Sequence, residues 1–280
     1  MPSQFLKVAL EAAKNAEEII TAYYTGDAMK VEMKEDETPV TLADRGAEKA
    51  IRETIKQAFP DHGFLGEEYG IEEGDSPYVW IIDPIDATKN YIRKIPIFGT
   101  QIALMKGEEL ILGVSNAPLL NELLYAEAGE GAFLNGEPIT VSNVTQSEDA
   151  MVCHGGLNWF VEKGTFPGIY NLINDAARTR GFGDFYMYHL VASARVDAVV
   201  EAAISIWDIA AITVIVREAG GKVTDIQGQP ITRALFGMSR VQSSVTDIQG
   251  QPITKETASL VATNGVLHNT VLDYFKDASS

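Results

Sequence analysis

Two aspartates three residues apart, Asp83 and Asp86, form the part of this sequence whose chemistry is clearest. The apolar residues 80–82 predict a short buried strand, which the proline after Asp83 should end because proline has no N–H for a ladder hydrogen bond. Ala87 and Thr88 follow at the predicted start of a helix. Carboxylates suit hard cations and helix N-termini suit phosphates, so the turn predicts a metal-assisted phosphate site. A helix start capped by Asp86 explains the same residues without a ligand.

Acidic residues elsewhere in the chain favour the phosphate site over a simple helix cap. Asp44 follows a polar loop, Glu67 follows an apolar pair, and Asp208 opens a long apolar run. Alone, Asp44 and Asp208 are explained as helix caps. Together with the central turn, their order and spacing resemble the inositol monophosphatase family of metal-dependent phosphatases over nearly the whole chain. The motifs that carry this resemblance are residues 38–44, 66–69, 80–91, 207–211 and 217–221.

The resemblance implies a metal cluster and a set of catalytic groups. Two or three Mg²⁺ ions are expected, one of which lowers the pKa of a bound water. Thr88 and Asp44 are expected to orient that water, and Glu67 to accept its proton. The N–H groups of Ala87 and Thr88 should hold the phosphate, with Asp208 also beside the substrate. The implied metal ligands are Glu67, Asp83, the Ile85 carbonyl, Asp86 and Asp208.

One residue departs from the family pattern, which usually has glycine where this chain has Ala87. If the position requires a positive φ, alanine costs on the order of 1 kcal/mol and could tilt the phosphate-binding amides. In a helical conformation alanine would be harmless. A catalytically impaired relative that binds phosphate compounds is therefore an alternative to an active phosphomonoesterase.

Residues 86–91, 96–100, 183–188 and 206–221 look most like the histidinol-phosphate phosphatase branch of the family. Histidinol phosphate carries an ammonium and an imidazole, so its leaving group should prefer a pocket lined by carboxylates. Asp184 and Glu201 are the candidates for that pocket, although a helix cap and a strand-end charge also explain them. A carboxylate can bind hydroxyls too, which keeps inositol monophosphate, or another sugar or nucleotide phosphate, as the alternative substrate.

Composition narrows the partners of the chain. Its 280 residues include 39 acidic and 22 basic side chains, a net charge of −17, which argues against nucleic acid or an anionic membrane surface. The single cysteine, Cys153, excludes an intrachain disulfide and indicates a reducing compartment. No signal sequence or membrane-spanning run is visible, so we expect a cytoplasmic protein with a small phosphorylated metabolite as partner. The family resemblance makes a homodimer the default expectation.

The predicted elements change in kind along the chain. Amphipathic helices are expected from Ser3 to about Tyr24 and from Asp44 to Phe59, and antiparallel strands follow to about 133. Beyond about 138, helices predicted over 157–180 (broken near 164–167), 185–194 and 208–218 alternate with short strands. This order predicts a layered mixture of α+β and α/β, with halves 1–137 and 138–280. The resemblance implies an αβαβα sandwich.

One ten-residue segment occurs twice, because residues 223–232 recur unchanged as 245–254. A solenoid would need several copies of a longer unit, so a tandem duplication or a cloning artefact is the simpler explanation. The family pattern needs only one strand and turn here. We therefore predict that the first copy pairs into a sheet and that 233–254 is a surface insertion, which is tolerated because loop closure costs rise slowly with length.

Overall fold

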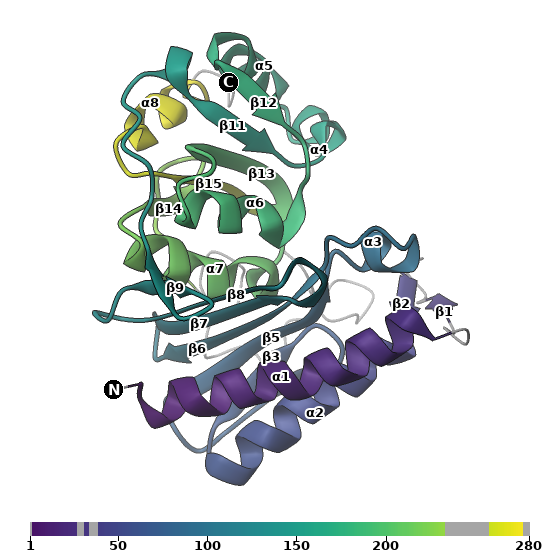
Figure 1. Ribbon diagram of the computed structural model, residues 1–280. Coiled ribbons are helices and arrows are strands. Elements are labelled where there is room, and N and C mark those ends of the chain that lie inside the picture. The colour runs from purple at the N-terminus through teal and green to yellow at the C-terminus, as the bar shows by residue number, and fades with distance from the viewer. Residues whose placement is uncertain (1, 27–30, 34–38, 233–257, 277–280) are drawn as a thin grey trace, which may run out of the picture.

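Two long helices near the start of the chain cover the outer face of a large sheet. The computed structural model describes residues 2–26, 31–33, 39–232 and 258–276, with α1 (Gln4–Thr25) and α2 (Leu42–Ala58) lying along this sheet (Figure 1). Ser3 caps α1, since its Oγ accepts the Leu6 N–H across 3.1 Å. The predicted amphipathic pattern is confirmed, because the buried side chains of both helices recur at helical spacing and pack on the strands.

The first sheet has eight strands in the order β10-β9-β8-β7-β6-β5-β3-β4. Neighbouring strands run antiparallel except β3 and β5, which are parallel. The antiparallel strands predicted up to residue 133 are therefore confirmed from β6 onward. The strands are β3 (Gly63–Gly66), β4 (Gly70–Glu72), β5 (Tyr78–Asp86), β6 (Gly99–Lys106), β7 (Glu109–Ala117), β8 (Glu122–Glu127), β9 (Ala132–Leu134) and β10 (Glu137–Ile139).

Strand β5 continues through Pro84 to Asp86, so the prediction that the proline ends it is wrong. Pairing with β6 passes from Asp83–Gln101 directly to Asp86–Gly99, which leaves one extra residue on β5. A proline is tolerated at such a bulge because no ladder hydrogen bond is required of it. In a regular strand, residues three apart point to opposite faces. The extra residue brings Asp83 and Asp86 to the same face.

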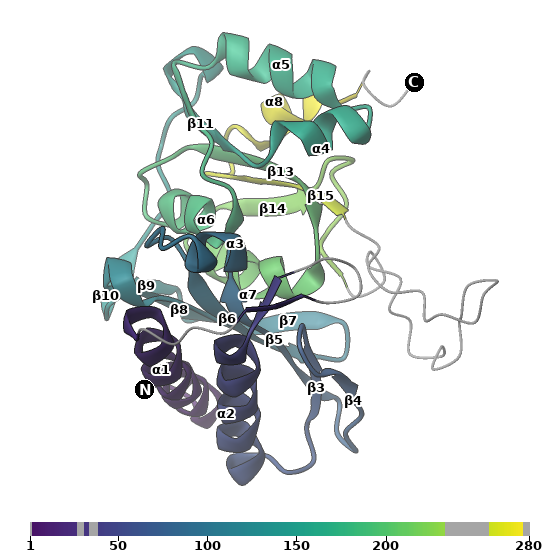
Figure 2. The ribbon, with the colours of Figure 1, turned by 90° about the vertical axis from the view of Figure 1, so that its right-hand side faces the viewer.

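Two apolar helices form the middle layer between this sheet and a second one, as both views show (Figures 1 and 2). Helices α6 (Asp184–Ala192) and α7 (Ile206–Glu218) are buried on most sides, as expected for helices covered by sheets above and below. The N-cap of α7 is Ser205, and Asp208 is its third helical residue. The prediction of Asp208 as the cap is therefore wrong by three positions.

The second sheet has five strands in the order β12-β11-β13-β15-β14, and three helices cover its outer face (Figure 2). The prediction of helix over 157–180 is wrong at its end, because 178–180 form an edge strand parallel to β11. The strands are β11 (Met151–His154), β12 (Arg178–Arg180), β13 (Ala198–Ile204), β14 (Lys222–Asp225) and β15 (Ala258–Thr263), and the helices are α4 (Leu157–Glu162), α5 (Phe166–Asp175) and α8 (His268–Asp273).

Helices and sheets thus alternate in five layers, which confirms the αβαβα sandwich. Small elements lie outside these layers: the paired strands β1 (Val31–Met33) and β2 (Pro39–Thr41), helix α3 (Thr88–Ile92), and 3₁₀ turns at Pro118–Leu120 and Ser147–Asp149. None of the helices in the described part of the chain is long and apolar enough to cross a membrane.

The first copy of the repeated segment supplies β14, whose Val223 pairs with Ala262 of β15. Residues 233–257 lie outside the described part of the chain, so the insertion at 233–254 stays a prediction. The division into halves 1–137 and 138–280 also stays a prediction. The strands of the eight-stranded sheet come from residues 63–139, and those of the five-stranded sheet from 151–263.

Candidate active site

Acidic side chains from several elements gather around the end of β5. Asp83 is buried, and its pKa is raised well above the usual range by burial first and then by the charges of Glu67, Asp86, Asp208 and Asp44. These residues come from the end of β3, from β5, from α7 and from α2. The structure therefore brings four of the acids that the sequence singled out within electrostatic reach of the fifth, Asp83.

Asp86 connects this group with a second pair of acids. Its pKa is raised by burial and then by the charges of Asp184, Asp208, Glu201 and Glu67. The acids predicted to hold metal and those predicted to contact the substrate thus lie side by side. Mutual repulsion among buried carboxylates is costly, and a bound cation would relieve it.

The turn after β5 has an unusual backbone at Ala87. Its φ of 68° and ψ of 43° lie in the left-handed region, and Ala87 is the N-cap of α3, so Asp86 is not the cap. The conformation is one that glycine adopts without strain, and an alanine there costs about 1 kcal/mol. Thr88 Oγ1 donates to the Ile85 carbonyl across 2.9 Å, which closes the turn on the atom predicted as a metal ligand.

The start of α7 fixes Asp208. Its Oδ2 accepts the Ser205 N–H across 2.7 Å, one half of a capping box. Burial and the charge of Glu67 raise the pKa of Asp208, while this hydrogen bond opposes the shift. Asp208 can therefore help to cap α7 and still lie among the acids of the candidate site.

The backbone beside Glu67 is held by a buried ion pair, Glu48 with Arg52, which sequence reasoning missed. Glu48 on α2 is fully buried, receives the Arg52 Nε–H across 2.8 Å, and accepts the Glu68 N–H across 2.8 Å. A Cβ on Gly66 would lie only 1.8 Å from Glu48 Oε1, so glycine is required there. The i,i+4 spacing of Glu48 and Arg52 was the available signal, although it is common on exposed helices.

Asp184 and Glu201 form a second cluster with Tyr188. Glu201 Oε1 accepts the Asp184 N–H across 3.0 Å, and its Oε2 accepts the Tyr188 hydroxyl across 2.7 Å. Burial and the charge of Asp184 raise the pKa of Glu201 to about 7. Burial also raises the pKa of Asp184 to about 6, against the opposing charge of Lys89. Tyr188 had no signal in the sequence beyond its neighbours.

The donor set suits a hard cation, although it is not closed into a cage. Among the described residues, no three His, Cys, Asp or Glu side chains stand in an arrangement that could hold a metal ion without moving. Asp83 Oδ1, however, is buried without a hydrogen-bond partner in the described part of the chain, which is costly for a carboxylate unless something else compensates it. All the candidate ligands are oxygen atoms, the donors that Mg²⁺ prefers.

Comparison with known proteins decides the family. The model of the inositol monophosphatase family matches residues 1–280. The chain belongs to the inositol monophosphatase family. It is 40% identical over 224 residues to a histidinol-phosphatase of Chlorobaculum parvum, covering 80% of this chain and 86% of the relative. It is 34% identical over 272 residues to a histidinol-phosphatase of Mycobacterium tuberculosis, covering 95% and 96%.

Solved structures agree with this assignment to the inositol monophosphatase family. The extragenic suppressor protein suhB from Bartonella henselae superimposes with a TM-score of 0.83 at 30% identity, covering 98% of this chain and 99% of that one. The chain is therefore a phosphatase of the inositol monophosphatase family. The predicted family and fold are both confirmed.

Proposed function

We propose that the chain is a Mg²⁺-dependent phosphomonoesterase that converts histidinol phosphate to histidinol and phosphate. The observation that carries the proposal is the position of Asp86, which lies within electrostatic reach of both the Asp83 group and the Asp184–Glu201 pair. A cation site and an acidic pocket for a cationic leaving group would thus be adjacent.

The residues that would hold two or three Mg²⁺ ions are Glu67, Asp83, the Ile85 carbonyl, Asp86 and Asp208. Bound ions would neutralise the phosphate charge and lower the pKa of water. The buried Oδ1 of Asp83 supports this assignment because no donor among residues 2–26, 31–33, 39–232 and 258–276 hydrogen-bonds to it. The identity of the ion is proposed from the preference of Mg²⁺ for oxygen ligands.

Hydrolysis needs a water whose oxygen attacks phosphorus while the ester P–O bond breaks. Thr88 donates its own proton to the Ile85 carbonyl, so its oxygen lone pairs are left to accept a hydrogen bond from that water. Asp44 would orient the water with Thr88, and Glu67 would take its proton. The alkoxide that leaves takes a proton from solvent.

The turn at Ala87 would hold the phosphate. The backbone N–H groups of Ala87 and Thr88 belong to the first residues of the turn into α3, and such groups suit anions. Ala87 has the left-handed backbone that glycine favours, so an alanine at this position costs stability.

The leaving group would lie against Asp184 and Glu201. A ligand ammonium or imidazolium favours the ionised carboxylate, so binding would lower the raised pKa of Glu201. A polyol leaving group such as inositol gains no such charge pairing. Specificity for histidinol phosphate therefore depends on these two acids, of which Glu201 is the more buried.

Phosphate release with and without Mg²⁺ tests the proposal, with histidinol phosphate compared against inositol monophosphate, fructose 1,6-bisphosphate and adenosine bisphosphate. We expect turnover that needs Mg²⁺ and favours histidinol phosphate. The Glu201→Gln variant should lose roughly tenfold in kcat/KM for histidinol phosphate and much less for inositol monophosphate. A folded protein that prefers inositol monophosphate would contradict the substrate, and one that hydrolyses no monoester would contradict the activity.

A further inference from the structure

A fully buried histidine joins the middle layer to the first sheet. His189 on α6 has partners at both ring nitrogens: Nε2 lies 2.6 Å from Ser115 Oγ on β7, and Nδ1 lies 3.3 Å from Glu122 Oε2 on β8. Burial lowers the pKa of His189, so the neutral ring carries one proton. That proton is donated to the carboxylate, and Ser115 donates its own proton to Nε2.

Serine, histidine and carboxylate in this order have the connectivity of a nucleophilic triad. Ser115 and His189 are each 0% exposed, however, so no substrate reaches the hydroxyl. A catalytic role is therefore excluded for Ser115, and a buried polar network of this kind has to act through the geometry it imposes.

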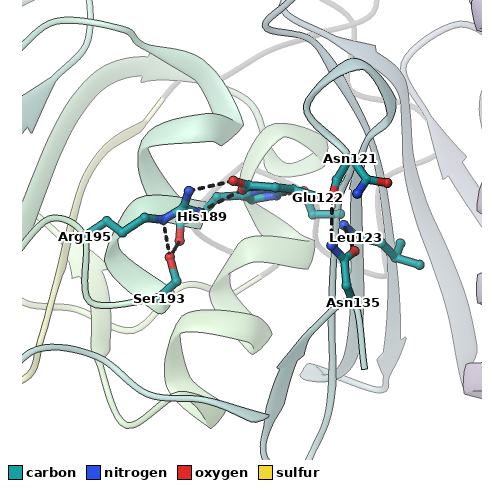
Figure 3. A network of polar contacts seen from close by, with 8 residues as sticks. Asn121, Glu122, Leu123, Asn135, His189, Ser193 and Arg195 are labelled. Carbon is teal, nitrogen blue, oxygen red and sulfur yellow. Dashed lines mark hydrogen bonds and ion pairs between the residues drawn. The ribbon is translucent and has the colours of Figure 1, made fainter. Parts of the chain in front are cut away.

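Two further groups hold Glu122 in place, one at its carboxylate and one at the backbone on either side of it (Figure 3). Arg195, just beyond α6, donates to it through Nη1 across 2.6 Å and through Nη2 across 2.8 Å. The side chain of Asn135 donates to the Asn121 carbonyl across 2.7 Å and accepts the Leu123 N–H across 2.9 Å. The backbone is thus held on both sides of Glu122, which makes it a rigid anchor for α6.

The other end of the same helix touches the candidate site. The Phe185 N–H donates to Asp86 Oδ2 across 3.2 Å, and the Asp184 N–H donates to Glu201 Oε1 across 3.0 Å. Phe185 and His189 are one turn apart, with ring centroids separated by 5.0 Å. A shift of His189 would therefore carry these two N–H donors with it.

The start of α6 also has a strained backbone that needs support. Asp184 has a φ of 58°, which is uncommon for a residue other than glycine and costs roughly 1–3 kcal/mol. Such a conformation persists only when the surroundings hold it in place. The contacts at His189 lie within the same nine-residue helix and are a second buried polar connection of α6 to the first sheet, besides the contact of Phe185 with Asp86.

We infer that Ser115, His189, Glu122 and Arg195 form a clamp that positions α6, so that its first N–H groups hold Asp86 for the cation and Glu201 for the substrate. We call these four residues the α6 clamp. They are positioning residues and contact neither substrate nor cation. The inference rests on the proposed function, because it takes Asp86 as a cation ligand and Glu201 as a substrate group.

The Glu122→Gln variant tests the α6 clamp, since glutamine keeps the shape of the side chain and removes its charge. Glu218→Gln is the matched control: Glu218 on α7 also joins the middle layer to the first sheet, accepting the N–H groups of Gly129 and Gly131 across 3.0 and 2.9 Å. Asn135→Ala is a second variant, which loosens the anchor without touching α6. The probes are amide hydrogen exchange and calorimetric titration with Mg²⁺ alone.

Glu122→Gln and Asn135→Ala should speed exchange in residues 184–192 and weaken Mg²⁺ binding, for Glu122→Gln by roughly tenfold, as for loss of an outer-shell contact. Glu218→Gln should change exchange only near 129–131 and leave Mg²⁺ binding unchanged. Unaltered exchange in 184–192, or an equal increase over the whole chain in all three variants, overturns the clamp. A wild-type protein that hydrolyses no phosphate ester overturns the proposed function alone, because exchange in 184–192 is measured without turnover.

Discussion

Trp80 donates its indole N–H to His62 Nδ1 across 3.0 Å, just before β5 reaches the candidate site. The imidazole is stacked between Phe59 and Tyr78, with ring centroids 4.7 and 4.8 Å away. Burial lowers the pKa of His62 below 6.5, with Asp61 opposing the shift. Because the neutral ring is favoured in the folded state, its contribution to stability is complete above pH 6.5 and is lost as the pH falls below it.

Acidification from pH 7.5 to 5 should therefore weaken the Trp80–His62 contact, since a protonated Nδ1 cannot accept the indole proton. We expect the intrinsic tryptophan fluorescence to change over this range and the melting temperature to fall. The His62→Phe variant keeps the stacking but has no acceptor, so its fluorescence should be much flatter with pH. Identical pH curves for the two proteins would contradict the prediction.

Replacing Ala87 by glycine should stabilise the protein. The left-handed backbone at this residue strains an alanine, and its relief is worth about 1 kcal/mol in the free energy of unfolding. If the strain also tilts the phosphate-binding amides, turnover should rise together with stability. Chemical denaturation and phosphate release on the same preparations measure both effects.

Ala194→Gly is a matched control for that experiment. Ala194 has a φ of 60° and is exposed, and its N–H bonds to the Val191 carbonyl in either variant. The control should gain similar stability without any change in turnover. Equal turnover gains in both variants would show that general stabilisation, and not the turn at Ala87, limits the rate.

The elements that position the candidate site were predictable only in part. Helices α1 and α2 follow from the spacing of their apolar residues, since one face packs on a sheet. The course of β5 through Pro84 could not be predicted, because the bulge exists only through the pairing of β5 with β6. On β6, the hydroxyl of Thr100, 16 residues further along the chain, donates to the Pro84 carbonyl. Local sequence carries no signal for such a partner.

The candidate site itself was reached through the resemblance, not through spacing alone. Asp83 and Asp208 are far apart in the chain, and the effect of the Asp208 charge on the pKa of Asp83 depends on α7 being placed against the first sheet. The contact of Glu48 with the Glu68 N–H and that of His189 with Ser115 were missed, since partners far apart in the chain leave no local pattern in the sequence. These contacts form only when the layers of the fold are packed together.

Gly66→Ala should destabilise the protein by about 1–3 kcal/mol, the usual cost of overpacking a buried site. The added methyl would meet Glu48 Oε1 at 1.8 Å and force this buried carboxylate from the Glu68 N–H. Gly46→Ala is the opposite case. Gly46 lies within α2, where alanine is the better helix former, and its added Cβ would meet only Ile19 Cγ2 of α1, at 3.4 Å. This variant should therefore be more stable than wild type by up to about 1 kcal/mol. Denaturant unfolding measures the free energy of unfolding of both variants. If Gly66→Ala left it unchanged, Glu48 would not support the backbone at Glu67 and Glu68.

Glu122 should make stability depend on pH in a window well below neutrality. Burial alone would raise the pKa of Glu122, but hydrogen bonds from His189 and Arg195, together with the charge of Arg195, lower it to about 2 from 4.5. A carboxylate with a depressed folded-state pKa stabilises fully above its unfolded value, and that contribution is lost as the pH falls through the folded value. The wild-type advantage over Glu122→Gln in unfolding free energy should therefore be constant above about pH 5 and shrink steadily between pH 4.5 and 2. Thermal unfolding of both proteins across this range measures the difference, and an advantage that stays constant down to pH 3 would mean that His189 and Arg195 do not hold the ionised Glu122.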